Sequence, residues 1–357
     1  MSQTVPTTAY ILRLEETTNG TGLLPFGHTL SPQFSIWTGT LFLLIIIMAI
    51  LGNSILIYTI LTVRRLHSVT HAFLVNLAVG DLVTATLTIP FDVDYMWRRY
   101  FPYGTLMCGV SQIGFFISLP SSVINLSLLT VERFVTIAYP YRRDDWFRRR
   151  NVVILLFVTW VYTLLVALSI VINDPDAVFV YHGICMVYPM PKGYPVFQLV
   201  VNFILPMSVI VLLNIRIFAI ANKHKGKIKK VSVPQMSSES TSMTRFSIGT
   251  NLKAAKRILL LVGVCAVCWL TYIICVAHNM TCGGCHPREV TWITNIINYS
   301  STAINPLLYG MTSKPIRHQL WKRLRQYKCC NTTQSTLRST RRHGVTGLPS
   351  ETQATEV

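Results

Sequence analysis

The sequence predicts an all-α integral membrane protein, a bundle of seven transmembrane helices with a short amphipathic helix after the last span. Of its 357 residues, 51% are hydrophobic and only 13% are charged, whereas soluble globular proteins carry about 25% charged residues. Seven apolar stretches are each long enough to cross a bilayer, which takes roughly 20 residues. Lys and Arg cluster in alternate connections between these stretches, as is typical of the cytoplasmic side of a membrane protein.

The seven stretches divide the chain into spans and connections. A run of about 20 predominantly apolar residues marks each span. Ionisable residues inside the second and third runs lower the local hydropathy, but seven spans fit the lengths best. The spans are predicted at Ile36–Val63, His71–Tyr95, Thr105–Ala138, Val152–Ile172, Pro195–Asn222, Leu252–His278 and Glu289–Met311.

The distribution of Lys and Arg predicts the orientation of the chain. The connections after the first, third and fifth spans and the segment after the seventh are basic, while the opposite side holds few basic residues. Cytoplasmic loops carry such an excess, so we expect a multi-pass protein of the plasma membrane with an extracellular N-terminus. The net charge of +18 then belongs to loops that flank the membrane, and it does not indicate a nucleic-acid partner.

Four segments follow from this topology. Residues 1–32 form an extracellular N-terminal segment, in which Asn19 begins an N-glycosylation sequon. Residues 33–312 form the seven-helix bundle. Residues 313–330 alternate apolar and basic side chains, which predicts an amphipathic helix on the membrane surface. Residues 331–357 are expected to be a disordered cytoplasmic tail.

The predicted cytoplasmic end carries three interaction signals. Cys329 and Cys330 directly follow the amphipathic segment, a position typical of palmitoylation; the alternative is two free thiols. The chain ends in Thr355, Glu356 and Val357, with the carboxylate, apolar last side chain and hydroxyl that PDZ domains capture. Ser and Thr residues of the third cytoplasmic loop and the tail are candidate phosphorylation sites, which could recruit an arrestin-like partner.

Polar residues inside the predicted spans indicate function, because polar groups are costly in a bilayer. Asp81 lies in the second span, Asn53 in the first, Ser122 in the third and Asn305 in the seventh. A buried carboxylate needs a partner or a proton. These residues together predict a bound cation or a water cluster, and the alternative is a purely structural hydrogen-bond network.

An acid–base pair, Glu132 and Arg133, ends the third span beside a basic loop. Arg133 lies 25 residues after Cys108 (133 − 108), which is about 38 Å of helix and enough to cross the bilayer. Cys108 is therefore expected at the outer surface and Arg133 at the inner one. The acid can hold Arg133 in an ion pair until a partner offers a better site; the alternative is an interfacial Arg that only reaches toward water.

Taken together, these residues resemble the rhodopsin-like (class A) G-protein-coupled receptors over about residues 33–328, most of all the peptide receptors. One characteristic residue or motif stands in each span, in the order of the family. The matching pieces are Gly52-Asn53, Leu77 with Asp81, Cys108, Glu132-Arg133-Phe134, Trp160, Pro206, Cys268-Trp269 and Asn305-Pro306-Leu307-Leu308-Tyr309.

The resemblance implies a receptor, not an enzyme, with no cofactor beyond a structural sodium ion. It implies a sodium pocket of Asp81, Ser122 and Asn305. It also implies a disulfide between Cys108 and Cys185.

Further roles follow from the same resemblance. Glu132, Arg133 and Tyr309 would couple the receptor to a heterotrimeric G-protein, and Trp269 would form the floor of the ligand pocket. Cys282 and Cys285 are candidates for a small second disulfide, which an extracellular location would keep oxidised.

Two positions depart from the family pattern. Leu270 and Thr271 follow Trp269, where the family commonly has a proline at the second position, so the usual kink of the sixth helix is missing. Asn251 stands where an acid would pair with Arg133 across helices, so that inactive-state lock is expected to be absent.

Single positions argue against two ligand classes. In amine receptors of this family an Asp stands seven residues after the outer Cys of the third span, and Phe115 occupies that position here. Opsins carry a Lys in the seventh span, and Tyr299 occupies that position. Biogenic amines and light are therefore not expected as stimuli.

Two carboxylates in the outer half of the second span, Asp92 and Asp94, favour a cationic ligand such as an Arg-containing peptide. They point about 200° apart on a helix, so at most one faces a pocket; the alternative is that both are solvated or pair with Arg98 and Arg99. We expect a neuropeptide or peptide hormone, and the alternative is a small non-peptide ligand, either a lipid or a metabolite. A channel or transporter is less favoured, because no internal repeat is present. The predicted binding set adds Gln112, Phe115, Phe116, Gln198, Trp269, Tyr272, Trp292 and Asn295.

Overall fold

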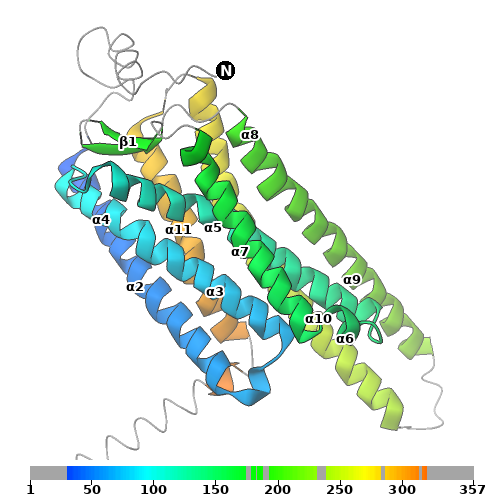
Figure 1. The fold of residues 1–357 in the computed structure, drawn as a ribbon. Helices are drawn as coiled ribbons and strands as arrows, with labels where there is room; N and C mark the ends of the chain where they lie inside the picture. Colours follow the sequence, from blue (N-terminus) through cyan, green and yellow to red (C-terminus); the bar gives the residue numbers. More distant parts are fainter. Residues whose placement is uncertain are drawn as a thin grey trace, which may run out of the picture.

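The computed structural model describes residues 30–173, 178–181, 183–187, 193–230, 239–282, 286–312 and 316–319. Within these residues the chain forms an elongated bundle of long helices that run roughly side by side, with a short β-hairpin across one end (Figure 1). The bundle confirms the predicted all-α fold with seven spans. We call the two ends of the bundle the hairpin end and, after a short helix that lies there, the α6 end.

The first three spans lie close to their predicted bounds. Helix α2 (Pro32–Thr62) begins where the Ser31 hydroxyl accepts a hydrogen bond from the backbone N–H of Phe34, an N-cap that satisfies one of the free donors of the first turn. A short 3-10 turn, η1 (Arg64–Leu66), leads into α3 (Val69–Leu87) and α4 (Ile89–Arg98), which together make the second span. The third span is a single helix, α5 (Gly104–Ala138).

The second span is interrupted, which the sequence interpretation did not anticipate. Helix α3 ends at Leu87 and α4 restarts at Ile89, with Pro90 in its first turn. Proline has no backbone N–H and crowds the preceding turn, so the helix breaks at Thr88. The Thr88 hydroxyl donates to the Ser111 carbonyl of α5 at 3.1 Å, and this bond joins the interruption to α5.

The remaining spans follow in order. A one-turn helix, α6 (Arg143–Trp146), precedes α7 (Arg149–Asn173), and the hairpin strands β1 (Val178–Tyr181) and β2 (Ile184–Val187) come next. The fifth span joins α8 (Tyr194–Leu199), a wider π-helical turn η3 (Val200–Ile204) and α9 (Leu205–Lys230). Such a bulge is common beside a proline, here Pro206. Helices α10 (Glu239–Thr281) and α11 (Arg288–Thr312) complete the bundle.

The seventh helix, α11, is more polar than the other six spans. Six spans within the described residues are long and apolar enough to cross a membrane by composition alone. Helix α11 has the length, at 25 residues, but carries buried Thr294, Asn298, Thr302 and Asn305. Its polar side chains face other helices, so it spans as part of the bundle and not through its own hydropathy.

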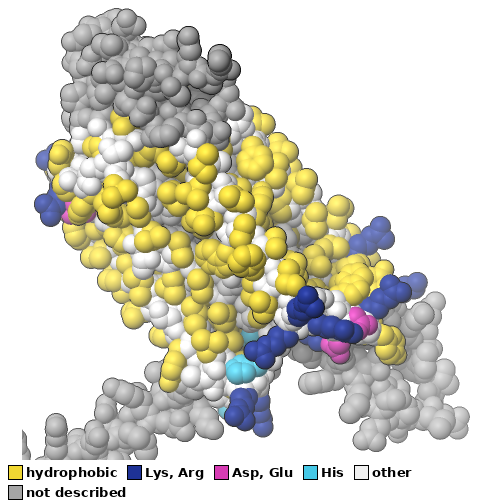
Figure 2. All heavy atoms as spheres, in the orientation of Figure 1, with side chains coloured by type: hydrophobic (Ala, Val, Ile, Leu, Met, Phe, Trp, Pro, Cys, Tyr) yellow, Lys and Arg dark blue, Asp and Glu magenta, His cyan; other side chains and the backbone are white. Residues whose placement is uncertain are grey.

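The surface of the bundle has the pattern that a bilayer requires. Large apolar side chains cover its sides, as Figure 2 shows, and Trp37, Phe157 and Ile172 are each at least 68% exposed. Most of the Lys and Arg side chains in that view gather at the α6 end. Buried side chains form two apolar clusters, one toward each end, centred on residues such as Leu126 and Leu77 in one and Phe42 and Met96 in the other.

The predicted amphipathic helix at 313–330 is only partly within the described residues. Residues 316–319 are helical, and Ile316 is 1% exposed and belongs to the apolar cluster at the α6 end. This anchors the start of the segment against the bundle.

Two glycines provide a paired test of helix packing. A Cβ on Gly52 would lie 2.6 Å from Cγ of Pro306 on α11, whereas a Cβ on Gly263 of α10 would meet nothing within 4 Å. We expect Gly52→Ala to destabilise the protein by about 1–3 kcal/mol, because the rigid proline ring has to move. Gly263→Ala should be neutral or slightly stabilising, since alanine favours a helix over glycine.

The measurement is the thermal unfolding midpoint of the purified protein in lipid nanodiscs. Equal midpoints for Gly52→Ala and Gly263→Ala would contradict the close approach of α2 and α11.

Candidate functional site

A disulfide bonds the β-hairpin to the first turns of α5. Cys108 in the first turns of α5 is bonded to Cys185 of β2, which confirms the predicted pair. The turn between β1 and β2 contains Gly183 at φ +73°, and a Cβ there would collide with the ring of Tyr100, so only glycine fits. The carbonyl of Gly183 also accepts a hydrogen bond from the N–H of Phe101 at 2.8 Å. The hairpin is thus held against both α5 and the end of α4.

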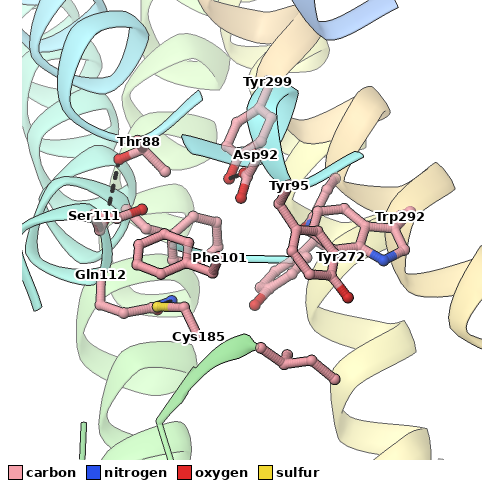
Figure 3. A pocket seen from close by; sticks show the side chains of 13 residues that line it. Thr88, Asp92, Tyr95, Phe101, Ser111, Gln112, Cys185, Tyr272, Trp292 and Tyr299 are labelled. Atoms are coloured by element: carbon pink, nitrogen blue, oxygen red, sulfur yellow. Dashed lines mark hydrogen bonds between the residues drawn. The ribbon is translucent and has the colours of Figure 1, made fainter. Parts of the chain in front are cut away.

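A cavity of about 180 Å³ lies beneath this hairpin (Figure 3). Its walls come from α4, the break before it and the loop after it, and from α5, β2, α10 and α11. The lining residues are Thr88, Asp92, Tyr95, Phe101, Ser111, Gln112, Phe115, Ile184, Cys185, Tyr272, Trp292, Asn295 and Tyr299.

One carboxylate faces the pocket. Asp92 of α4 accepts a hydrogen bond from the hydroxyl of Tyr299 on α11 at 2.7 Å, and both side chains lie at the cavity in Figure 3. Among the described side chains, no Lys, Arg or His lies within 4.0 Å of the Asp92 carboxylate. A carboxylate that has one neutral donor and no cation keeps most of its capacity to accept from a positively charged group.

A second unfilled acceptor among the lining residues lies on α11. The side-chain oxygen of Asn295 is buried, and no described residue donates to it. A buried polar atom without a partner costs roughly 1–3 kcal/mol. Asn295 therefore favours a molecule in the pocket that brings a donor.

Aromatic rings make up most of the remaining wall. Tyr95 and Trp292 stack with centroids 5.5 Å apart and planes at 25°. Phe115 packs edge-on against Tyr272 and Tyr299, at 5.3 and 6.2 Å. Rings surround the carboxylate side of the pocket, and the faces of such rings attract cations.

The structure brings six of the ten predicted ligand residues to the cavity and leaves four outside its lining. The six are Asp92, Gln112, Phe115, Tyr272, Trp292 and Asn295, and the four are Asp94, Phe116, Gln198 and Trp269.

The four residues outside the lining have other partners. Asp94 forms an ion pair with Arg98 at 2.7 Å and accepts from the Tyr103 hydroxyl, which is the alternative that the sequence left open. Gln198 donates to the hydroxyl of Tyr194 at 2.8 Å.

Phe116 packs edge-on against Tyr194 at 5.5 Å, away from the cavity. Trp269 lies one layer below, with its ring centroid 6.2 Å from those of Phe115 and Tyr272. It supports two lining residues without lining the pocket itself.

Several lining residues escaped the sequence interpretation. Thr88 lies at the break of the second span, Tyr95 on α4, Phe101 in the loop after α4 and Ser111 on α5. Pro90 was the available signal, because a proline inside a predicted span marks a place where the helix can change direction.

The buried polar residues of the mid-bundle lie together in part. Asn305 of α11 donates to the Asp81 carboxylate at 3.0 Å, and Asp81 is 1% exposed. The Asn53 amide donates to the Thr302 carbonyl at 3.0 Å, so three helices meet here. Ser122 is buried on α5, but among the described residues no hydrogen bond joins it to Asp81.

A network of charges lies at the α6 end. Glu132 is fully buried and pairs with Arg133 at 3.4 Å and with Arg143 at 3.2 Å. The Thr70 hydroxyl of α3 donates to Glu132 at 3.0 Å and accepts from Arg133 at 3.0 Å. A buried acid satisfied by two cations and a hydroxyl holds α3, α5 and the α6 segment in one arrangement.

Some predicted sites lie outside the described residues. These are Asn19, Cys329, Cys330 and the terminal Thr355–Val357, together with Cys285 and the side chain of Asn251. Cys282 is disulfide-bonded, but its expected partner Cys285 is among the residues outside the description.

Comparison with known proteins gives a consistent result. The family model described as "7 transmembrane receptor (rhodopsin family)" matches residues 52–309. The alpha-1A adrenergic receptor of Rattus norvegicus is 24% identical over 318 residues, which cover 82% of this chain and 68% of that receptor. The human alpha-1A receptor is 23% identical over 313 residues, covering 80% and 67%. The human alpha-1D adrenergic receptor is 25% identical over 340 residues, covering 86% of this chain and 59% of the relative.

The hydroxyl of Thr70 is the testable centre of the charge network. Thr70→Val keeps the shape of the side chain but removes its bonds to Glu132 and Arg133, so we expect a loss of about 1–3 kcal/mol in stability. Thr40→Val is the matched control, because the Thr40 hydroxyl bonds only within the exposed face of α2. Thermal unfolding in nanodiscs should show a lower midpoint for Thr70→Val alone; two unchanged midpoints would mean that the network adds no stability.

Proposed function

This chain belongs to the rhodopsin family of seven-transmembrane receptors, and we propose that it is a receptor for a small, positively charged organic ligand that binds beside Asp92. Ligand binding at the hairpin end then activates a heterotrimeric G-protein at the α6 end. The observation that carries the proposal is the Asp92 carboxylate, which faces an aromatic cavity and has no cationic partner among the described residues.

The size of the cavity favours the small-ligand alternative over the expected peptide. Pockets that hold drug-sized ligands measure roughly 300–1,000 Å³, and this cavity measures about 180 Å³. The β-hairpin and its disulfide cover the entrance from one side, which leaves little room for an extended chain. None of the three relatives compared above is named as a peptide receptor.

The expectation that biogenic amines are not ligands depended on a single position in the third span, and it is withdrawn. Phe115 stands where an acid would be expected in the third span, but Asp92 reaches the same cavity from α4. The carboxylate is therefore supplied by another helix. Phe115 itself supplies a ring for the apolar part of the ligand, and the adrenergic names of the relatives agree with a small ligand.

A primary or secondary ammonium group matches the polar atoms of the pocket. Such a group carries a positive charge and at least two N–H donors. One donor can reach the Asp92 carboxylate in a charge-assisted bond, and another can fill the orphaned oxygen of Asn295. The rings of Tyr95, Trp292 and Tyr299 would then pack around the charge.

The charge network at the α6 end is the proposed coupling site. Arg133 is held by Glu132 and Thr70, and Glu132 is shared with Arg143. A G-protein segment that offers Arg133 a carbonyl or carboxylate would compete with these contacts. The concentration of visible basic side chains at this end (Figure 2) supports its placement in the cytoplasm, with the N-terminus outside at the plasma membrane.

We further propose that Asp81 and Asn305 hold a sodium ion. Asp81 is buried beside one amide donor, and no described cation pairs with it. A buried carboxylate in that state lacks a counter-charge, and oxygen ligands from Asp81, Asn305 and Ser122 suit a hard cation. Sodium would supply the missing charge; a structural network with a protonated Asp81 is the alternative.

The ligand proposal is tested by a screen with two matched variants. Cells that express the receptor with G-protein sensors are given small primary and secondary amines, their neutral hydroxyl analogues and amidated peptides. We expect an amine to be the agonist. Asp92→Asn should reduce its potency roughly ten- to hundredfold, from a loss of about 1.4–3 kcal/mol. Asp94→Asn should leave potency unchanged, because Asp94 is paired with Arg98. Activation by peptides or neutral analogues alone would reject the ligand proposal. Equal losses of potency in Asp92→Asn and Asp94→Asn would also reject it.

The sodium proposal is tested by stability. Titration of purified receptor with NaCl, at ionic strength held constant with N-methylglucamine chloride, should raise the unfolding midpoint, because an ion that binds only the folded state stabilises it. Asp81→Asn should abolish the sodium-dependent shift, and Asp94→Asn should retain it. A sodium-independent midpoint in the unmodified receptor would favour the structural network.

A further inference from the structure

Two histidines face each other where α10 leads into α11. His278 lies in the last turn of α10, and His286 lies just before α11. Their facing nitrogens, Nδ1 of His278 and Nε2 of His286, are 2.8 Å apart, and the ring centroids are 4.7 Å apart. Two residues eight positions apart in sequence thus bring two imidazole nitrogens within hydrogen-bonding distance of each other.

The surrounding loop holds this pair in place. The backbone N–H of His286 donates to the side-chain oxygen of Asn279 at 3.1 Å. The N–H of Cys282 donates to the carbonyl of His278 at 3.0 Å, and Cys282 is itself disulfide-bonded. These contacts of Asn279 and Cys282 hold the backbone beside both rings, so the two rings are positioned in advance.

We propose that His278 and His286 form a binding site for a divalent transition-metal ion such as Zn²⁺, which bridges the hairpin-end termini of α10 and α11. Imidazole nitrogen is a preferred ligand of zinc and its neighbours in the first transition series. The described residues contain no group of three or more His, Cys, Asp or Glu arranged around one metal position. The site therefore uses two protein ligands, and water completes the coordination.

The geometry needs only a small adjustment. Zinc binds imidazole nitrogen at about 2.0–2.1 Å in a tetrahedral arrangement, which sets the two nitrogens about 3.3 Å apart. The facing nitrogens at 2.8 Å have to separate by roughly half an ångström. One of these nitrogens now carries the shared hydrogen, so that ring moves its proton to its other nitrogen, and both facing lone pairs then point at the metal.

Exposure and charge allow the ion to enter and to keep its water ligands. The His278 side chain is exposed and that of His286 is half-buried. Arg288 is the nearest described cation along the chain, and its guanidinium donates to the Tyr95 hydroxyl of α4 at 3.0 Å. Glu289 opens α11 and adds a negative charge to the same turn.

A metal here would be linked to the ligand pocket. Tyr272 precedes His278 on α10, and Trp292 lies in the second turn of α11; both line the pocket. A bridge between the two helix ends restricts the separation of the walls that carry these residues, so metal and ligand should alter each other's affinity.

The test measures zinc binding directly and does not depend on the proposed receptor activity. The full-length receptor in nanodiscs is freed of metal with a chelator, and equilibrium binding of radioactive Zn²⁺ is measured over the micromolar range. We expect one saturable site that weakens by about tenfold or more in His278→Ala and in His286→Ala. His67→Ala is the matched control, since His67 is an exposed histidine at the α6 end that bonds the Leu61 carbonyl, and it should bind zinc like the unmodified receptor.

Two further variants separate folding from metal binding. His278→Gln and His286→Gln keep a hydrogen-bonding side chain in the loop but remove the imidazole. Their metal-free unfolding midpoints should match that of the unmodified receptor, while the zinc site is lost. A zinc isotherm that is the same in all variants, or the absence of saturable micromolar binding in the unmodified receptor, would overturn the proposal.

Discussion

Hydrocarbon offers no hydrogen-bonding partner to a peptide group, so each segment that crosses the bilayer must satisfy its own backbone. The long helices meet this demand, and the same constraint sorts their side chains. Apolar residues such as Trp37 and Phe157 face outward, while Asp81, Asn298 and Glu132 are buried between helices. Helix α11 shows the constraint most clearly, because its polar residues are stable in the membrane only where the other helices surround them.

The proposed ligand site is built where the helices are interrupted or cross-linked. The second span breaks at Thr88 beside Pro90, and one turn later Asp92 of α4 meets Tyr299 of α11. The disulfide from Cys108 to Cys185 fixes the hairpin above them. Each of these features costs the chain regular hydrogen bonds or conformational freedom. Together they place one carboxylate and one orphaned amide oxygen in a small aromatic cavity, which is the arrangement that a small cation requires.

The charge network and the pocket lie at opposite ends of the same helices. Helix α5 carries Gln112 and Phe115 in the pocket and Glu132 and Arg133 at the α6 end. The second span likewise carries Asp92 at one end and Thr70 at the other. The geometry of both sites therefore depends on the relative positions of α3, α4 and α5. A ligand that favours one arrangement of these helices changes both sites.

The sequence by itself determined the seven spans and placed Cys108 and Arg133 at opposite ends of α5, because length, hydropathy and charge act locally along a chain. It also singled out Asp81, Glu132 and Arg133, since polar residues are rare within such spans. Only the tertiary structure decided between Asp92 and Asp94. The two side chains point in different directions from one helix: Asp92 meets Tyr299 of α11, whereas Asp94 pairs with Arg98 one turn further along α4. The meeting of His278 with His286 was likewise hidden, because the path of the loop between two helices is set by their packing and not by the spacing of the residues.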